Sequence, residues 1–391
     1  MKDYLGRTDV DAPATKTARL VECSGPAGRR APNELAESDP DAADVLLKIE
    51  AAATQRRFAR TFDDGEVNAD EVTSALRKYD GLNADGKDTV DNLLSTTGDD
   101  GADLVTNADG ETLRILADGS GSIDQSYRRG VARAADGDSI DSYKQLYRAV
   151  RKVDDLDGTQ QRRAKQLIAE TDGAGVKLVD ELGDDTLRRV LGDSDIDAAD
   201  LSRATRKYGE LDGENARVFR EFLKDDTLRD SWIRVAGSPE TSQAAVRTAL
   251  VRVRNVEGKI DVQRFRKASD VNDQERYSGM EDPYTDETIV IDTQVQGKTK
   301  FARVHGESNQ ARSWMFETRD DIKGLTRSEI QEKYSLPDEP SYVSDVNVPD
   351  RTEVRIGDTA ANFDGREGAT QYELLERIDP DRFTNRERLP L

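Results

Sequence analysis

His305 is the only histidine of this 391-residue chain, and histidine is the side chain best suited to exchange protons near neutral pH. It follows a strand-like segment, residues 300–304, and precedes Gly306, so the end of a strand would present it to a cleft. The alternative is a surface histidine that caps a turn, and the sequence leaves both interpretations open. Arg303 and Arg312 lie close by in the chain and supply cationic groups.

A second group of polar residues follows Gly368, whose missing side chain lets backbone approach a ligand closely. Gln371 and Glu373 would face the same side of an alternating strand. The amide could orient a substrate while the carboxylate stabilises developing positive charge; the alternative is an edge strand with polar residues outward. Tyr372 completes this group, and Trp314 could stack on a base, although filling the core is commoner.

The elements that would position these residues form an α+β domain over residues 285–391. A helix is expected over residues 326–334, because Thr326 with Glu329 three residues later is a capping-box pattern. Alternating or β-branched segments predict the strands. These strands cover residues 288–292, 300–304, 342–348 and 352–356, and a final one begins near Thr370.

The preceding chain has a different character, all-α and internally repeated. An Arg-Lys pair followed by Tyr or Val recurs at residues 77–79, 151–153 and 206–208, with Asp-Gly turns between helical apolar spacings. This pattern predicts stacked helical hairpins over residues 41–258. Residues 1–40 are expected to form a flexible leader and residues 259–284 a linker.

The composition is strongly acidic, with 79 Asp and Glu against 58 Lys and Arg and a net charge of −21. Because the acid is spread along the chain, we interpret it as adaptation to high salt rather than as mimicry or repulsion of nucleic acid. Cys23 is the only cysteine, which excludes an intrachain disulfide and a cysteine-rich zinc site. An acidic loop at residues 118–122 resembles a calcium loop, but Ile123 stands where glycine is needed. We therefore expect no metal site.

Targeting features are also missing from the sequence. No apolar run approaches membrane-spanning length, and the first residues lack the apolar stretch of a secretory signal. The Arg29-Arg30 pair is not followed by an apolar stretch either, so it does not fit a twin-arginine export signal. We therefore expect the protein to be made in the cytoplasm without a classical signal peptide. If it is exported or delivered into neighbouring cells, we expect an export apparatus that does not read such a signal.

Several segments of the C-terminal part resemble the variable C-terminal toxin modules of polymorphic toxins, including contact-dependent inhibition and Rhs-type effectors. They are residues 312–315 (Arg-Ser-Trp-Met), 321–326 (Asp-Ile-Lys-Gly-Leu-Thr), 333–337 (Lys-Tyr-Ser-Leu-Pro), 345–349 (Asp-Val-Asn-Val-Pro) and 383–385 (Phe-Thr-Asn). In that class a long delivery or repeat region carries a compact toxin. The resemblance implies a toxic enzyme and a cognate immunity protein as partner.

Within this class the Gly-x-x-Gln-Tyr-x-Leu ending resembles NAD-glycohydrolase toxins, and Gln-x-Glu resembles ADP-ribosyltransferases. The resemblance implies that Arg303 binds the cofactor phosphates, that Gln371 and Glu373 act at the nicotinamide ribose, and that Tyr372 or Trp314 stacks. NAD would be a substrate, with no cofactor bound permanently. The Gly-Ala-Thr before the glutamine departs from the expected glycine-rich loop, and a Ser-Thr-Ser motif is missing.

The alternative activity is a ribonuclease that cleaves tRNA or another RNA. His305 would be the acid or base, Arg303 or Arg312 would stabilise the phosphorane, and Glu307 or Glu373 would supply the partner group. A second alternative is a non-enzymatic surface or structural repeat protein with a small binding domain. Of these, the NAD-consuming enzyme is the interpretation we prefer.

Overall fold

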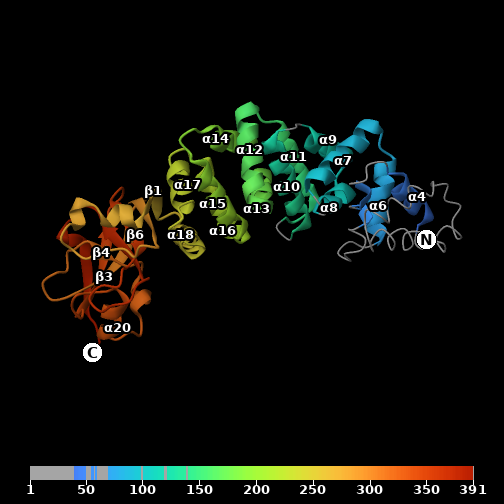
Figure 1. The fold of residues 1–391 in the computed structure, drawn as a ribbon. Coiled ribbons are helices and arrows are strands. Elements are labelled where there is room, and N and C mark those ends of the chain that lie inside the picture. The colour runs from blue at the N-terminus through green and yellow to red at the C-terminus, as the bar shows by residue number, and fades with distance from the viewer. Residues whose placement is uncertain are drawn as a thin grey trace. The chain divides into compact units, whose positions relative to one another are not determined.

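The structure is a computed structural model, which describes residues 39–49, 54–56, 58–59, 69–97, 100–118, 121–137 and 140–390 (Figure 1). The expected leader, with Cys23, Arg29 and Arg30, lies almost entirely outside the described residues. The chain forms two compact units, Met1–Asp193 and Ser194–Leu391. Among the described residues, no helix is both long enough and apolar enough to cross a membrane.

The described part of the first unit is helical. Its helices with assigned bounds are α4 (Pro40–Lys48), α6 (Ala69–Asp80), α7 (Ala84–Thr97), α8 (Asp100–Asn107), α9 (Gly110–Ala117), α10 (Ser122–Asp136), α11 (Tyr143–Asp154), α12 (Gly158–Thr171), α13 (Gly173–Glu181) and α14 (Asp184–Gly192). Helices two apart in the chain pack together, as α6 does with α8, α10 with α12 and α11 with α13.

Helix α11 illustrates why these segments are helical and how they begin and end. Leu146, Ala149, Val150 and Val153 are buried at helical spacing, which gives the helix one apolar face. The Asp-Gly turn that follows starts α12, because the Asp157 carboxylate accepts hydrogen bonds from two backbone N–H groups of the first turn. The Asp-Gly turn between these two helices therefore caps the second of them.

The second unit begins with four helices and continues into two antiparallel sheets. The helices are α15 (Ala198–Gly209), α16 (Gly213–Lys224), α17 (Arg229–Ala236) and α18 (Gln243–Asn255). The five-stranded sheet has the order β1 (Ile260–Lys267), β2 (Ile289–Val295), β6 (Glu353–Asp358), β7 (Thr370–Leu374) and β4 (Trp314–Met315). The three-stranded sheet has the order β3 (Thr299–His305), β5 (Tyr342–Val348) and β8 (Phe383–Arg388). Short helices α19 (Ala268–Asn272) and α20 (Arg327–Lys333) complete the unit.

The α+β class, with helices first and strands after, agrees with the sequence analysis. Strands β2, β3, β5, β6 and β7 lie where alternation predicted them, and α20 begins at the predicted capping box of Thr326 and Glu329. The sequence analysis missed β1, β4 and β8. The expected linker over residues 259–284 is wrong, because strand β1 and helix α19 occupy most of it and β1 pairs with β2.

Strand β1 packs against the helices that precede it in the chain. Phe265 lies 4.7 Å from the ring of Phe222 and 4.8 Å from that of Trp232, measured between ring centroids. All three side chains are buried. Residues 285–391 are therefore not a separate unit, since the sheet and helices α15–α18 share one core.

Three lysines make the same kind of contact at the ends of neighbouring helices. The ammonium groups of Lys78, Lys152 and Lys207 donate hydrogen bonds to backbone carbonyls at the C-terminal ends of α8, α13 and α17. The acceptors are Thr106 and Ala108 for the first, Val179, Asp180 and Leu182 for the second, and Ala236, Ser238 and Thr241 for the third. A cation at this end also complements the helix dipole.

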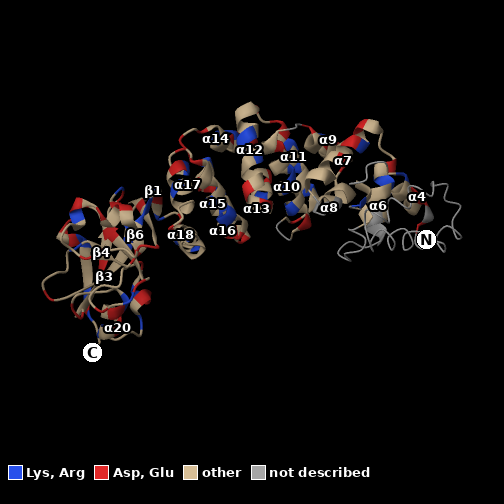
Figure 2. Ribbon diagram, viewed as in Figure 1, with Lys and Arg blue, Asp and Glu red and all other residues tan. Residues whose placement is uncertain are grey.

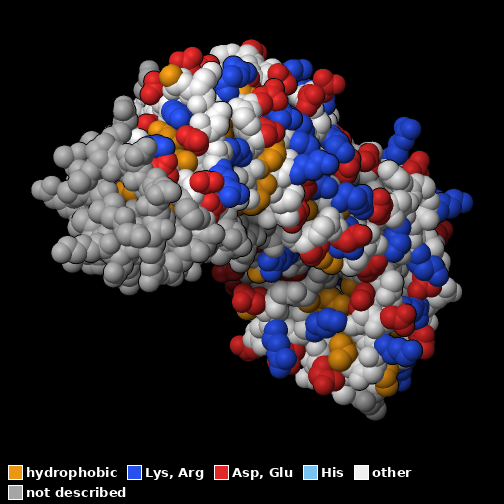
Figure 3. Space-filling model, turned by 90° about the vertical axis from the view of Figure 1, so that its right-hand side faces the viewer, with side chains coloured by type: hydrophobic (Ala, Val, Ile, Leu, Met, Phe, Trp, Pro, Cys, Tyr) orange, Lys and Arg blue, Asp and Glu red, His pale blue; other side chains and the backbone are white. Residues whose placement is uncertain are grey.

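Charged residues are interspersed along the chain. Acidic and basic residues alternate along helices and strands without a long block of one sign in the described part (Figure 2). On the face drawn in Figure 3, hydrophobic side chains appear only as small separate patches among charged ones. Within the described ranges, no group of His, Cys, Asp and Glu side chains is arranged to hold a metal ion.

Candidate active site

Glu373 is the most deeply buried of the predicted site carboxylates, with its side chain only 3% exposed. Strand β7 lies between β6 and β4, which covers both edges of the residue's backbone. Its carboxylate accepts hydrogen bonds from the hydroxyl groups of Tyr277 and Tyr284, the latter at 3.0 Å. Arg276 forms an ion pair with the same carboxylate at 3.1 Å. Three donors therefore converge on one buried acid.

Arg355 and Asp292 lie behind the tyrosine donors. The Arg355 guanidinium donates to the Tyr277 hydroxyl at 3.0 Å and forms a buried ion pair with Asp292 at 2.7 Å. Arg266 pairs with the other oxygen of the Asp292 carboxylate at 2.5 Å. Asp292 thus neutralises the buried Arg355. Arg355 in turn holds the Tyr277 hydroxyl in position to donate to Glu373.

The protonation of this cluster follows from its burial. Burial raises the pKa of Glu373, while the hydrogen bond from Tyr277 and the charges of Arg276 and Arg355 oppose this shift. Burial also raises the pKa of Tyr277 and of Tyr284, so both stay protonated hydrogen-bond donors. A buried acid with a perturbed pKa and specific partners is a candidate functional group, although structural ion pairs perturb pKa values in the same way.

Gln371 faces the same side of β7 as Glu373, as the alternation predicted. Its side-chain amide donates to the backbone carbonyl of Pro283 at 2.8 Å, next to Tyr284 in the chain. The side chains of Gln371 and Glu373 therefore both contact the segment that leads from α19 to β2.

The two aromatic residues have separate environments. Tyr372 points to the opposite face of β7, where its ring lies 5.0 Å from that of Phe301. Trp314, in β4, pairs with Glu373 through its backbone, and its half-buried ring lies edge-on to Tyr284 at 5.9 Å. Only Trp314 is thus close to the carboxylate cluster.

Arg303 has a structural environment that the sequence did not predict. Its buried guanidinium donates to the backbone carbonyls of Asn309, Gln310 and Trp314, and so fixes the loop that precedes β4. Burial, reinforced by the charge of Arg312, lowers the pKa of Arg303 to about 10. Arg312 itself is exposed. A phosphate could reach Arg303 only by displacing this loop.

His305 ends strand β3 as predicted, but the structure buries it instead of presenting it to a cleft. It is 3% exposed; its Nε2 lies 2.9 Å from the Ser344 hydroxyl and its Nδ1 lies 2.6 Å from the Gly306 carbonyl. Burial lowers the pKa of His305. It belongs to the three-stranded sheet and Glu373 to the five-stranded one, and the hydrogen-bond partners of the two side chains are different.

The sequence analysis missed the three donors to Glu373 and the arginine behind them. One signal was available: Gly357, a glycine inside a strand, marks a site where another group approaches closely. A methyl group on Gly357 would lie 2.5 Å from the Tyr284 ring, so only glycine leaves room for the ring at this place.

Comparisons with known proteins add no relative. No family model matches the chain, and neither the curated proteins nor the solved structures contain a match.

Proposed function

We propose that the sheet-containing part of the second unit is a toxic enzyme that hydrolyses NAD at the bond between nicotinamide and ribose. The observation that carries this proposal is the Glu373 carboxylate, buried beside Gln371 and held by Tyr277, Tyr284 and Arg276. Such a fixed carboxylate suits a transition state that resembles an oxocarbenium ion, because it is already oriented and needs no rearrangement as charge develops.

In this reaction the carbon–nitrogen bond breaks, and nicotinamide leaves as a neutral molecule with the bonding electron pair. Water then adds to the anomeric carbon and loses a proton. Glu373 stabilises the positive ribose, while the Gln371 amide holds a ribose hydroxyl in place of the Pro283 carbonyl. No general acid is needed for the leaving group, which fits a site in which His305 takes no part.

The substrate must displace something to reach the carboxylate. Arg276 is the outermost of the groups that hold Glu373, since its side chain is 36% exposed against 3% for the glutamate. We infer that a bound dinucleotide moves Arg276 outward and takes its place beside Glu373.

Ribonuclease activity is the second candidate, and the surroundings of His305 favour it. The imidazole stacks on Tyr342 with 5.7 Å between centroids, and the Arg386 guanidinium lies 3.7 Å from the same ring. Arg386 is 3.7 Å from Glu307, so a cation and an acid lie close to the histidine. The burial of His305 weighs against this candidate.

For the helical region we propose a repeated carrier of the polymorphic-toxin type, supported by the equivalent contacts of Lys78, Lys152 and Lys207. A cognate immunity protein and delivery into neighbouring cells belong to the same proposal. In the described part of helices α4 to α18, no side chain contacts Glu373.

The test induces the full chain in cells that lack an immunity protein and measures cellular NAD and intact tRNA. Glu373→Gln preserves size but removes the charge, and we expect NAD consumption to fall about a hundredfold or more. Glu376→Gln, an exposed neighbour, is the matched control and should remain fully active. His305→Ala should have a milder effect. Degraded tRNA with unchanged NAD would reject NAD hydrolysis in favour of the ribonuclease.

A further inference from the structure

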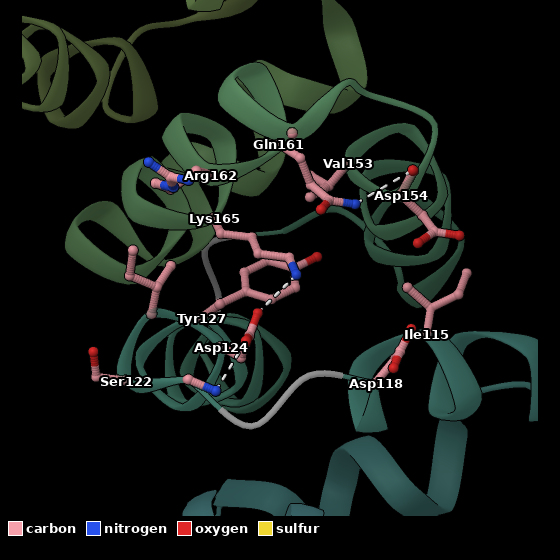
Figure 4. Close-up of a pocket in the computed structure, with 13 residues that line it drawn as sticks. Ile115, Asp118, Ser122, Asp124, Tyr127, Val153, Asp154, Gln161, Arg162 and Lys165 are labelled. Atoms are coloured by element: carbon pink, nitrogen blue, oxygen red, sulfur yellow. Dashed lines mark hydrogen bonds and ion pairs between the residues drawn. The ribbon is translucent and has the colours of Figure 1, made fainter.

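The first unit contains a cavity of about 480 Å³ that lies apart from the Glu373 cluster. It is bounded by the C-terminal ends of α9 and α11 and by the N-terminal ends of α10 and α12 (Figure 4). Its volume lies within the range of small-molecule sites. Its lining is mainly polar, with Ile115, Ile123 and Val153 as the larger apolar side chains.

Tyr127 supplies the most informative group of this lining. The residue is 2% exposed, and its hydroxyl oxygen has no hydrogen-bond partner within the described ranges. Burial, reinforced by the charge of Asp154, raises the pKa of Tyr127, so the hydroxyl keeps its proton. A buried hydroxyl without a partner is costly, and a ligand in the cavity would supply the missing bond.

Lys165 lies over the ring of Tyr127. Its ammonium group pairs with the Asp124 carboxylate at 2.7 Å and lies 5.8 Å from the centre of the Tyr127 ring. Figure 4 shows the lysine side chain crossing the tyrosine at the centre of the view. Gln161 closes another side, where its amide donates to the Asp154 backbone carbonyl at 3.4 Å.

The charges of the lining decide which ligand chemistry fits. Three aspartates face two cations, so the formal charges sum to −1. These residues are Asp118, Asp124, Asp154, Arg162 and Lys165. The carboxylates disfavour a phosphate or a carboxylic acid, and the lysine and arginine disfavour a metal ion. Hydroxyl groups on a ligand suit both the carboxylates and the cations of the lining, because a hydroxyl group donates one hydrogen bond and accepts others.

We propose that this cavity binds a neutral polyhydroxylated molecule of the size of a mono- or disaccharide. The ligand accepts a hydrogen bond from the Tyr127 hydroxyl and from the Lys165 ammonium, and donates to the Asp154 carboxylate. The site is independent of the proposed enzymatic activity.

The test titrates the full chain with glucose, sucrose and trehalose by calorimetry, beside phosphate, acetate and magnesium chloride. We expect at least one sugar to bind, with an affinity that changes little between low and high sodium chloride because the ligand carries no charge. Binding of phosphate, acetate or magnesium in place of the sugars would overturn the proposal, as would the failure of all three sugars at millimolar concentration.

Tyr127→Phe removes only the hydroxyl without a partner. We expect it to weaken sugar binding about tenfold while leaving the ligand-free melting temperature unchanged or higher. Tyr147→Phe is the matched control, because its hydroxyl donates to the Asn107 carbonyl elsewhere in the same unit. This control should lower the melting temperature and leave sugar binding unchanged. A loss of stability in ligand-free Tyr127→Phe would mean that the hydroxyl is satisfied without a ligand, and would overturn the inference.

Discussion

The guanidinium of Arg252, near the end of helix α18, is paired with the carboxylate of Asp358, the last residue of strand β6. Both side chains are largely buried, at 6% and 14% exposure. The same guanidinium reaches the hydroxyls of Thr288 and Thr370, each at 3.2 Å. One arginine thus links helix α18 to three separate segments of the sheet-forming chain.

Replacing Arg252 by Met should destabilise the second unit strongly, because Asp358 would keep a buried charge without its partner. Breaking such a pair costs about 3–5 kcal/mol. Urea unfolding of the full chain measures the loss. Arg247→Met, on the exposed side of the same helix, should change stability by no more than about 0.5 kcal/mol. Equal losses in the two variants would show that the buried pair does not hold the helix to the sheet.

Gly357→Ala should disturb the candidate site without touching any charged group. The added methyl would meet the Tyr284 ring at 2.5 Å, so the ring must move and its hydrogen bond to Glu373 must weaken. We expect a loss of about 1–3 kcal/mol in unfolding free energy and a changed tyrosine signal in near-ultraviolet circular dichroism. Gly213→Ala, where nothing lies within 4 Å, is the control and should leave both measurements unchanged. An unaltered spectrum for Gly357→Ala would contradict the close approach.

Asp345 provides a test of pH dependence. Burial alone would raise the pKa of Asp345, but hydrogen bonds from Asn385, Lys300 and Arg319 outweigh it and lower the pKa to about 2 from 3.8. A lowered pKa means that the folded state favours the ionised form, so the stabilisation is complete above pH 3.8 and is lost as the pH falls towards 2.

Asp345→Asn should therefore cost about 2 kcal/mol at pH 7, from a shift of nearly two units at about 1.4 kcal/mol each. The cost should shrink as the pH falls through this window. Urea titrations over the pH series measure it, with the exposed Asp338→Asn as the control that should show little effect. A cost that stays constant down to pH 2 would contradict the assigned protonation.

Elements specified by local chemistry were predictable from the sequence. Helix α20 begins where Thr326 and Glu329 form their capping box, and Gln371 and Glu373 share a face because side chains alternate along a strand. Strand β1 was not predictable, because its many charged residues are typical of a linker. Phe265 makes it a strand through contacts with Phe222 and Trp232, which belong to earlier helices.

The candidate site shows the same division. The side of strand β7 that Glu373 faces could be predicted from the sequence. Its partners Tyr277 and Tyr284 could not, because they lie 96 and 89 residues away in the chain and no local pattern predicts such contacts. The position of His305 at the end of a strand was predicted correctly. Its burial was not, because His305 is packed against a neighbouring strand whose Ser344, its hydrogen-bond partner, lies 39 residues later in the chain.

The pairing of the strands implies an order in which the two units acquire their structure during synthesis. The lysine contacts of the helical unit span 27 to 30 residues, so each can form soon after its helices leave the ribosome. Strand β2 can pair with β6 only after the ribosome has added about 60 more residues. Arg252 can contact Thr370 only after 118 more residues have been added. Because distant contacts form slowly, the second unit should fold last, and the largely apolar strand β2 is the nascent surface most in need of a chaperone.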